Sequence, residues 1–230
     1  VSRREVRQPG RRRPCRGSRQ NLGVRRVYLL GDAVTSRTLG VVLAGGRSSR
    51  MGRDKALLEI GGETFLQRTA RTLAAATEGD IAVSVAEAST AYASLAWTLI
   101  PDDSDLKDCG PIGGVVSAMR WARGRKIFDR ILTLSVDMPL VTTSAIQALA
   151  RGSPGCAVAS HSGSTNPTFA VWLLDTLDDI ERLSSTNGRR ALHAILARIG
   201  AVPVPLDTFD PAQFVNVNTP DDYAALRSLI

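Results

Sequence analysis

Residues 39–55 read LGVVLAGGRSSRMGRDK, and this stretch decides the fold. The run LGVVLA is typical of a strand that is buried on both faces of a parallel sheet. Gly45 and Gly46 follow directly, and Arg47, Arg50, Arg53 and Lys55 add four cations. Glycines let the backbone approach a ligand closely, and successive backbone N–H groups can hold phosphate oxygens. Because the spacing fits neither GxxxxGK[ST] nor GxGxxG, we predict a phosphate-binding loop of another kind, with a solvated basic loop as the alternative.

Downstream of this loop, short apolar runs alternate with helical patterns. Strands are predicted over residues 39–44, 81–86, 97–100, 131–136, 156–160, 169–172, 201–206 and 214–217. Helices are predicted over residues 65–76, 112–122, 144–150, 174–183, 189–199 and 220–229. This alternation predicts an α/β protein, a Rossmann-like three-layer α/β/α fold with a mostly parallel sheet. Ligands of such sheets bind at the carboxyl ends of the strands.

The net charge of +7 divides unevenly along the chain. Residues 1–38 hold eleven Arg against Glu5 and Asp32, which leaves 18 Lys and Arg against 20 Asp and Glu in residues 39–230. Residues 1–26 are too poor in apolar residues to fold by themselves, and we expect residues 1–38 to form a disordered extension, followed by one domain over 39–230. Three interpretations stay open: an arm that binds nucleic acid, an inert extension, or an over-extended reading frame, since the sequence begins with Val. The acidic body argues against nucleic acid as the main ligand.

The cysteines and the apolar runs of the sequence argue against disulfide-rich, zinc-bound and membrane proteins. The three cysteines, Cys15, Cys109 and Cys156, are far apart and form no CxxC pair, which argues against a disulfide framework and a structural zinc site. No apolar run reaches the about 18 residues of a membrane helix, and no signal-peptide core follows the basic start. We therefore expect a cytoplasmic protein without a membrane partner.

Two acidic positions follow predicted strands. Asp137 comes after ILTLSV and before Met138-Pro139, and Asp102 follows the strand that ends near Ile100. Mg²⁺ is usually held by one or two carboxylates together with substrate phosphates, so Asp137 beside a phosphate loop is a candidate ligand. The alternatives are a helix cap for Asp137 and an ordinary polar loop for Asp102. Residues 110–114 (GPIGG) open a helix whose N-terminal amides could face an anion, or they form a simple tight junction.

These motifs together resemble the molybdenum cofactor guanylyltransferase family of nucleotidyltransferases, also called molybdopterin-guanine dinucleotide synthases. The loop LAGGRSSRMGRDKALL is similar to the family's LAGGxSxRMGxDKxLL, and the resemblance continues to residue 230 through Asp102, residues 110–114, VDMP over 136–139 and FVNVNTP over 214–220.

The resemblance implies roles for particular residues. Arg50, Lys55 and Asp137 would be catalytic, and Asp137 would bind Mg²⁺, with Asn218 as a second metal ligand or a pterin contact. Arg189 and Asn216 would face the pterin. The nucleotide would contact the residues Leu43, Ala44, Gly45, Gly46, Lys55, Asp102 and Asp137. On this basis a methyl group added at Gly45 is expected to face the nucleotide rather than the core.

The reaction implied by the resemblance transfers GMP from GTP to the terminal phosphate of molybdopterin and releases pyrophosphate. A phosphate monoester is mostly ionised at neutral pH, so no general base is required. Molybdoenzymes or cofactor-delivery proteins would receive the product. Two alternatives stay open: a cytidylyltransferase acting on the same pterin, and a non-enzymic nucleotide-binding protein.

Overall fold

The computed structural model describes residues 37–45, 54–87, 92, 96–107, 109–185 and 191–228. Residues 34–230 form one compact unit. Of the predicted extension, only Arg37 and Thr38 are described, and both belong to the fold. The Arg37 backbone N–H donates to Asp129 Oδ2 at 3.0 Å, and its guanidinium pairs with Asp80 at 2.7 Å. The described part of the fold thus includes two residues before Leu39.

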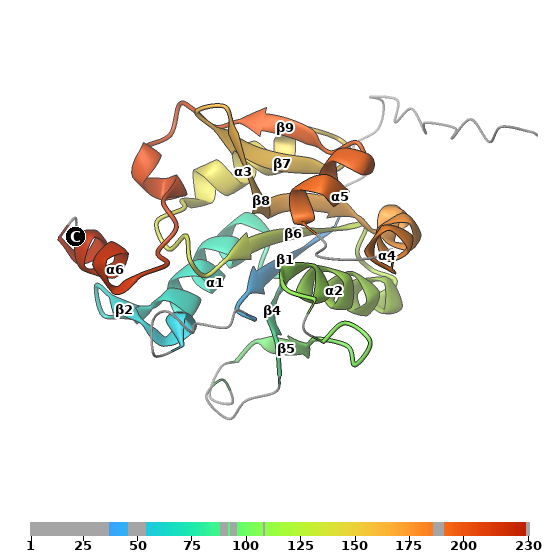
Figure 1. The fold of residues 1–230 in the computed structure, drawn as a ribbon, viewed down its shortest axis with the longest axis horizontal. Coiled ribbons are helices and arrows are strands. Elements are labelled where there is room, and N and C mark those ends of the chain that lie inside the picture. The colour runs from blue at the N-terminus through green and yellow to red at the C-terminus, as the bar shows by residue number, and fades with distance from the viewer. Residues whose placement is uncertain are drawn as a thin grey trace, which may run out of the picture. The chain divides into compact units, whose positions relative to one another are not determined.

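A seven-stranded sheet forms the middle layer (Figure 1). Its strands are β1 (Thr38–Leu43), β4 (Ile81–Val85), β5 (Thr98–Pro101), β6 (Arg130–Ser135), β7 (Ala157–His161), β8 (Ser164–Leu173) and β9 (Val202–Pro205). The spatial order is β5-β4-β1-β6-β8-β7-β9. Only β8 runs antiparallel to its neighbours β6 and β7, and the other described pairings are parallel. The predicted mostly parallel sheet is confirmed.

Helices cover both faces of this sheet. The helices α1 (Phe65–Ala76) and α3 (Thr143–Arg151) pack on one face, and α2 (Pro111–Arg125), α4 (Leu177–Ser185) and α5 (Leu192–Arg198) pack on the other (Figure 1). In β1, Val42 belongs to the first core, whereas Leu39, Val41 and Leu43 belong to the second. Successive strand residues point to opposite faces, so an apolar run without alternation supplies both cores. The three-layer α/β/α prediction is confirmed.

Local capping sets where several helices begin. Thr64 and Gln67 form a capping box, and α1 therefore begins at Phe65 as predicted. Thr219 and Asp222 form a second capping box at the start of α6 (Pro220–Arg227). Pro111 occupies the first turn of α2, where its missing N–H costs no hydrogen bond.

The structure differs from the predicted elements in three places. The strand predicted over residues 214–217 is wrong, because Asp210 caps a short 3-10 helix, η4 (Pro211–Phe214), and residues 215–218 follow without pairing to the sheet. β8 begins at Ser164 rather than residue 169, because a tight turn with positive φ at Ser162 and Gly163 joins it to β7. A small hairpin of β2 (Glu59–Ile60) and β3 (Glu63–Thr64) was not predicted. Among the described residues, no helix has the length and apolar character needed to cross a membrane.

Candidate active site at the carboxyl edge of the sheet

The loops that carry the predicted site residues meet at one edge of the sheet. β4 and β5 lie on one side of β1 and β6 lies on the other, so the strand order reverses between β1 and β6. Open α/β sheets bind ligands at such a point. Hydrogen bonds continue beyond the strand ends: Ala44 N donates to Ser84 O at 2.9 Å, and Val136 N donates to Leu43 O at 3.2 Å. The sheet therefore fixes the backbone that leads into the glycine-rich loop.

Gly45 lies against the neighbouring strand rather than open space. A Cβ at this position would lie 3.0 Å from the Ala86 backbone nitrogen and 3.3 Å from the Val85 carbonyl carbon. The expectation that an added methyl would face the nucleotide is therefore wrong, because the vacant position is directed at the end of β4. Glycine is needed here for close packing of two backbone segments.

Asp137 and Asp102 each hold a buried carboxylate oxygen at this edge. In the described part of the chain, Oδ1 of Asp137 and Oδ1 of Asp102 have no hydrogen-bond partner. Burial raises the pKa of Asp137, while a hydrogen bond from Ser135 and the charge of Lys55 oppose that shift. Burial and the neighbouring Asp103 raise the pKa of Asp102 to about 6. Native proteins rarely leave buried polar atoms unpaired, so two such oxygens at a strand edge point to a ligand or cation.

The N-terminus of α2 packs tightly onto Asp102. A Cβ at Gly113 would lie 2.8 Å from the Leu106 carbonyl oxygen and 3.1 Å from Asp102 Oδ2. One at Gly114 would lie 2.3 Å from the Ser84 hydroxyl. Gly113 and Gly114 therefore let the first turn of α2 approach both side chains, and an anion at the amides of this helix start stays a prediction.

Lys55 is held by the segment that precedes α6. Its Nζ donates to Asn218 Oδ1 at 2.7 Å. Asp222 Oδ2 accepts the backbone N–H groups of Asn218 and Thr219, each at 2.8 Å. Val217 N also donates to Asp137 O at 2.8 Å, which places this segment beside the candidate metal ligand Asp137. Asp222 was not predicted as part of this arrangement, although Thr219-x-x-Asp222 has the spacing of a capping box.

Arg120 clamps the loop that carries Asp102. Its guanidinium contacts Asp103 at 2.8 Å, Asp105 at 3.0 Å and Glu181 at 2.7 Å. The Asp103 backbone N–H also donates to the Ser117 hydroxyl of α2 at 2.9 Å. These contacts tie the loop to α2 and α4, and no sequence motif indicated them.

The other predicted site residues are placed as follows. Gly46, Arg50 and Arg189 lie outside the described residues. Asn216 is exposed beside the buried Val217. The Asn218 oxygen that a metal would use contacts Lys55, and its role as a metal ligand stays a prediction. No group of three or more His, Cys, Asp or Glu side chains with metal-binding geometry occurs among the described residues.

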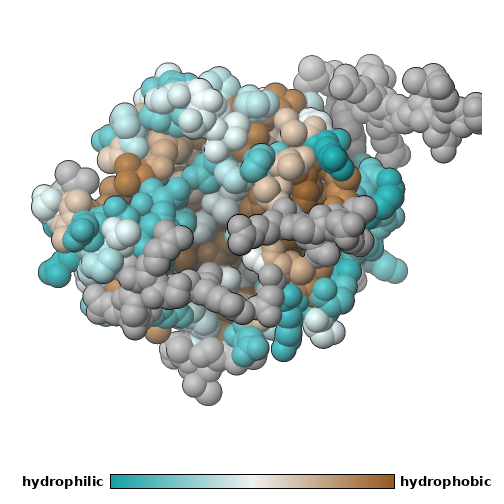
Figure 2. Space-filling view, in the orientation of Figure 1, coloured by the Kyte–Doolittle hydropathy of each residue, from teal (hydrophilic) through white to brown (hydrophobic). Residues whose placement is uncertain are grey.

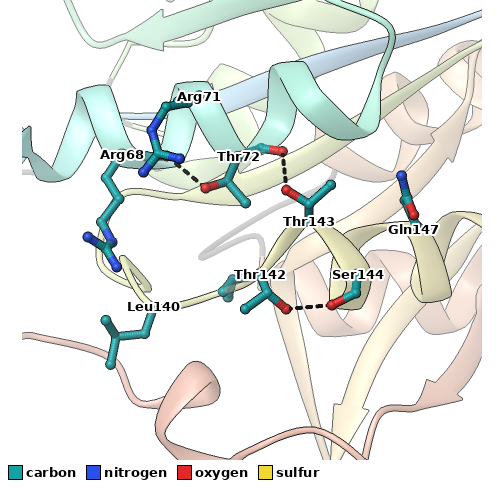
Figure 3. Close-up of a pocket in the computed structure, with 9 residues that line it drawn as sticks. Arg68, Arg71, Thr72, Leu140, Thr142, Thr143, Ser144 and Gln147 are labelled. Carbon is teal, nitrogen blue, oxygen red and sulfur yellow. Dashed lines mark hydrogen bonds between the residues drawn. The ribbon is translucent and has the colours of Figure 1, made fainter.

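A separate pocket of about 550 Å³ lies between α1 and α3 (Figure 3). It is lined by Arg68, Arg71, Thr72, Leu140, Val141, Thr142, Thr143, Ser144 and Gln147, none of which is a predicted site residue. Arg68 donates to the Pro139 carbonyl oxygen at 2.9 Å and Arg71 pairs with Glu63 at 2.9 Å, so both cations already have partners.

On the face in Figure 2, hydrophobic residues are interspersed with hydrophilic ones.

Residues 40–202 match the MobA-like NTP transferase domain, which is more than half of the chain. The chain belongs to the MobA-like NTP transferase family. This MobA-like transferase is accordingly a nucleotidyltransferase, and the matched range contains the glycine-rich loop, Asp102 and Asp137.

Individual relatives of the transferase agree with this assignment. It is 33% identical over 190 residues to molybdenum cofactor guanylyltransferase of Rhodobacter capsulatus, covering 82% of this chain and 94% of that protein. Its fold is similar to molybdopterin-guanine dinucleotide biosynthesis protein A of Archaeoglobus fulgidus (TM-score 0.68, 22% identity, 83% of this chain and 97% of the other). It is also similar to a Mycobacterium tuberculosis H37Rv protein solved in complex with manganese (TM-score 0.63, 21% identity, 85% and 100%).

Proposed function

We propose that this MobA-like transferase is a molybdenum cofactor guanylyltransferase that moves GMP from GTP to the terminal phosphate of molybdopterin. An oxygen of that phosphate attacks the α-phosphorus of GTP, the bond from the α-phosphorus to the bridging oxygen breaks, and pyrophosphate leaves. The identity to a curated guanylyltransferase over most of both chains supports the choice of reaction.

The observation that carries the proposal is the pair of buried carboxylate oxygens at the carboxyl edge that have no hydrogen-bond partner among the described residues. Asp137 lies close enough to Lys55 for the charge of the ammonium to act on it. A carboxylate for a cation and an ammonium for phosphate oxygens are the two charges that nucleotidyl transfer needs. Such an edge suits a nucleoside triphosphate better than an uncharged ligand.

A divalent cation fits the residues that are present. Asp137 Oδ1 is buried and lacks a partner in the described part of the chain, and a carboxylate oxygen is a hard ligand of the kind that Mg²⁺ prefers. We propose that Asp137 holds Mg²⁺ together with substrate phosphates. When bound, the ion supplies neutralisation of the phosphate charge.

The chain's own residues supply alignment and electrostatics. We propose that Lys55, held at 2.7 Å by Asn218, balances phosphate charge, and that Asp102 contacts the nucleotide. Arg50 and the backbone of residues 43–46 would add to the phosphate side, and Arg189 and Asn216 to the pterin side. A phosphate monoester is mostly ionised at neutral pH, so none of these residues has to remove a proton. A cytoplasmic location and delivery of the product to molybdoenzymes are part of the same proposal.

Nucleotide competition tests the proposal. The full chain is supplied with molybdopterin, Mg²⁺ and either GTP or CTP, and the dinucleotide product and pyrophosphate are measured. A pocket that hydrogen-bonds one base leaves its polar groups unpaired with the other. We expect GTP to be preferred at least about tenfold in kcat/KM, which corresponds to ~1.4 kcal/mol. Equal use of both nucleotides would reject the guanylyltransferase assignment, and turnover of neither would reject the acceptor.

A further inference from the structure

Tyr92 lies in the segment between β4 and β5 and contacts Asp54, the residue that caps the short helix after the glycine-rich loop. Its side chain is only 5% exposed, and its ring belongs to the core on the α1 side of the sheet. The phenol donates a hydrogen bond to Asp54 Oδ2, across 38 residues of sequence. No motif in the sequence predicted this pair.

Asp54 uses its other carboxylate oxygen to cap a helix. Its Oδ1 accepts the Ala56 backbone N–H at 3.0 Å and so starts η1 (Lys55–Leu57). Both carboxylate oxygens of Asp54 are therefore engaged, one by the phenol and one by the backbone. Such a carboxylate is fixed in one orientation, and the short helix that it caps is fixed with it.

Lys55 is the first residue of that short helix. Its backbone carbonyl accepts the Leu58 N–H at 3.0 Å, and Ala56 beside it is 1% exposed. With the backbone anchored on one side, the side chain reaches Asn218 Oδ1 at 2.7 Å. The placement of the ammonium thus depends on the cap, and the cap depends on Tyr92.

We infer that Tyr92 is a positioning residue for Lys55. Tyr92 acts through Asp54 and itself touches neither substrate. This inference rests on the proposed role of Lys55 in nucleotidyl transfer. Burial first, and then the hydrogen bond and charge of Asp54, raise the pKa of Tyr92 above its usual range, so the phenol keeps its proton and remains a donor while the enzyme works.

The experiment compares two Tyr→Phe variants that each lose one hydroxyl. Tyr92→Phe removes the contact with Asp54, and the control Tyr223→Phe removes a hydroxyl that donates to the Glu59 carbonyl oxygen at 2.6 Å. Misplacing a charged group by a fraction of an ångström is expected to lower kcat of Tyr92→Phe about tenfold, with the KM for GTP within about threefold. Tyr223→Phe should keep the wild-type kcat. Melting curves are recorded for both variants.

A double-mutant cycle separates positioning from general loss of structure. In a Lys55→Met background, Tyr92→Phe should change the rate by less than about twofold, because the group that it positions is gone. Asp54→Ala removes both the cap and the acceptor of the phenol, and it should reproduce the kcat loss. A wild-type kcat for Tyr92→Phe, or an equal loss in both backgrounds, overturns the inference while leaving the proposed function intact. A Lys55→Met enzyme with wild-type turnover instead shows that the role of Lys55 itself is wrong.

Discussion

Asp102 and Asp137 each place one carboxylate oxygen in a buried position without a hydrogen-bond partner among the described residues. Burial disfavours the charged form of a carboxylate, and burial is the main reason that the pKa values of both groups are raised. Asp222 differs from both, because its Oδ2 accepts two backbone N–H groups. At the scale of single residues, the unpaired atoms are the ones available to a ligand.

Asp137→Asn keeps the shape of the side chain and weakens a ligand for a hard cation. We expect turnover to fall by a factor on the order of 10²–10³, with partial recovery at raised Mg²⁺. The melting temperature should not fall, because the variant removes a buried charge. Rates with GTP and molybdopterin over a Mg²⁺ series, together with thermal melts, measure both effects. Turnover near the wild-type rate would show that Asp137 is not a metal ligand; it is also not the cap of α3, which is Thr142.

Asp102 should make the stability of the unliganded protein depend on pH. Its folded-state pKa of about 6 lies above the ordinary value of 3.8, so between these values the folded state binds more protons than the unfolded state. Stability therefore falls as the pH rises through this window. Asp102→Asn removes the dependence, and we expect it to raise the melting temperature at pH 7.5 and to change it little at pH 4.5. An equal change at both pH values would contradict the raised pKa.

At the scale of elements, α2 approaches the sheet closely enough that its first turn has no room for side chains at two positions. The obstacle at Gly113 is the Leu106 backbone, and the obstacle at Gly114 is the Ser84 side chain, which is 1% exposed. The same approach brings the N-terminal end of the helix next to Asp102. The position of α2 and the setting of the carboxylate are thus one feature.

Gly113→Ala tests this contact, and Gly124→Ala in the same helix is its control. At Gly113 the new methyl meets a backbone carbonyl at 2.8 Å, and we expect a loss of about 1–3 kcal/mol of stability. At Gly124 nothing lies within 4 Å, so the alanine should stabilise α2 by up to about 1 kcal/mol. Urea unfolding of both variants measures the difference. Equal stability of the two would show that α2 can shift away from Leu106.

Features that depend on residues close together in the sequence could be predicted, whereas features that depend on contacts between distant segments could not. The helix over residues 65–76 followed from the spacing of its apolar residues, and the strand before the glycine-rich loop followed from its unbroken apolar run, since both signals are local. The predicted strand over residues 214–217 is absent. Phe214 and Val217 pack against the α1-side core, and the Val217 N–H donates to the Asp137 carbonyl oxygen instead of to a strand partner. The direction of the missing Cβ at Gly45 and the Lys55–Asn218 contact depend on segments that only the tertiary structure brings together.

At the scale of the whole molecule, charge is divided along the chain. Residues 1–36 hold ten Arg against Glu5 and Asp32, and residues 37–230 hold 19 Lys and Arg against 20 Asp and Glu. The alkaline sequence pI of about 10.0 therefore describes the N-terminal segment rather than the domain. The domain itself is nearly neutral, and several of its cations pair with carboxylates, as Arg120 does.

Deleting residues 1–36 tests whether the segment contributes to the fold. A chain that begins at Arg37 keeps the pairs with Asp80 and Asp129, and we expect the full-length melting temperature and activity. Any DNA binding by the longer chain should weaken with salt and disappear on deletion, because it would come from Arg contacts with phosphates. Calorimetry and a salt titration of DNA binding measure both. A melting temperature lower by several degrees would contradict the proposed boundary.

The contact between Lys55 and Asn218 joins positions 163 residues apart. During synthesis, the glycine-rich loop and its lysine leave the ribosome long before residue 218 exists, and folding proceeds largely from the N-terminal side. A nascent chain that has completed α1 and β6 carries Lys55 and Asp137 but lacks the asparagine that holds the ammonium. On the proposed role of Lys55, we therefore expect a chain that is cut short before this segment to be inactive.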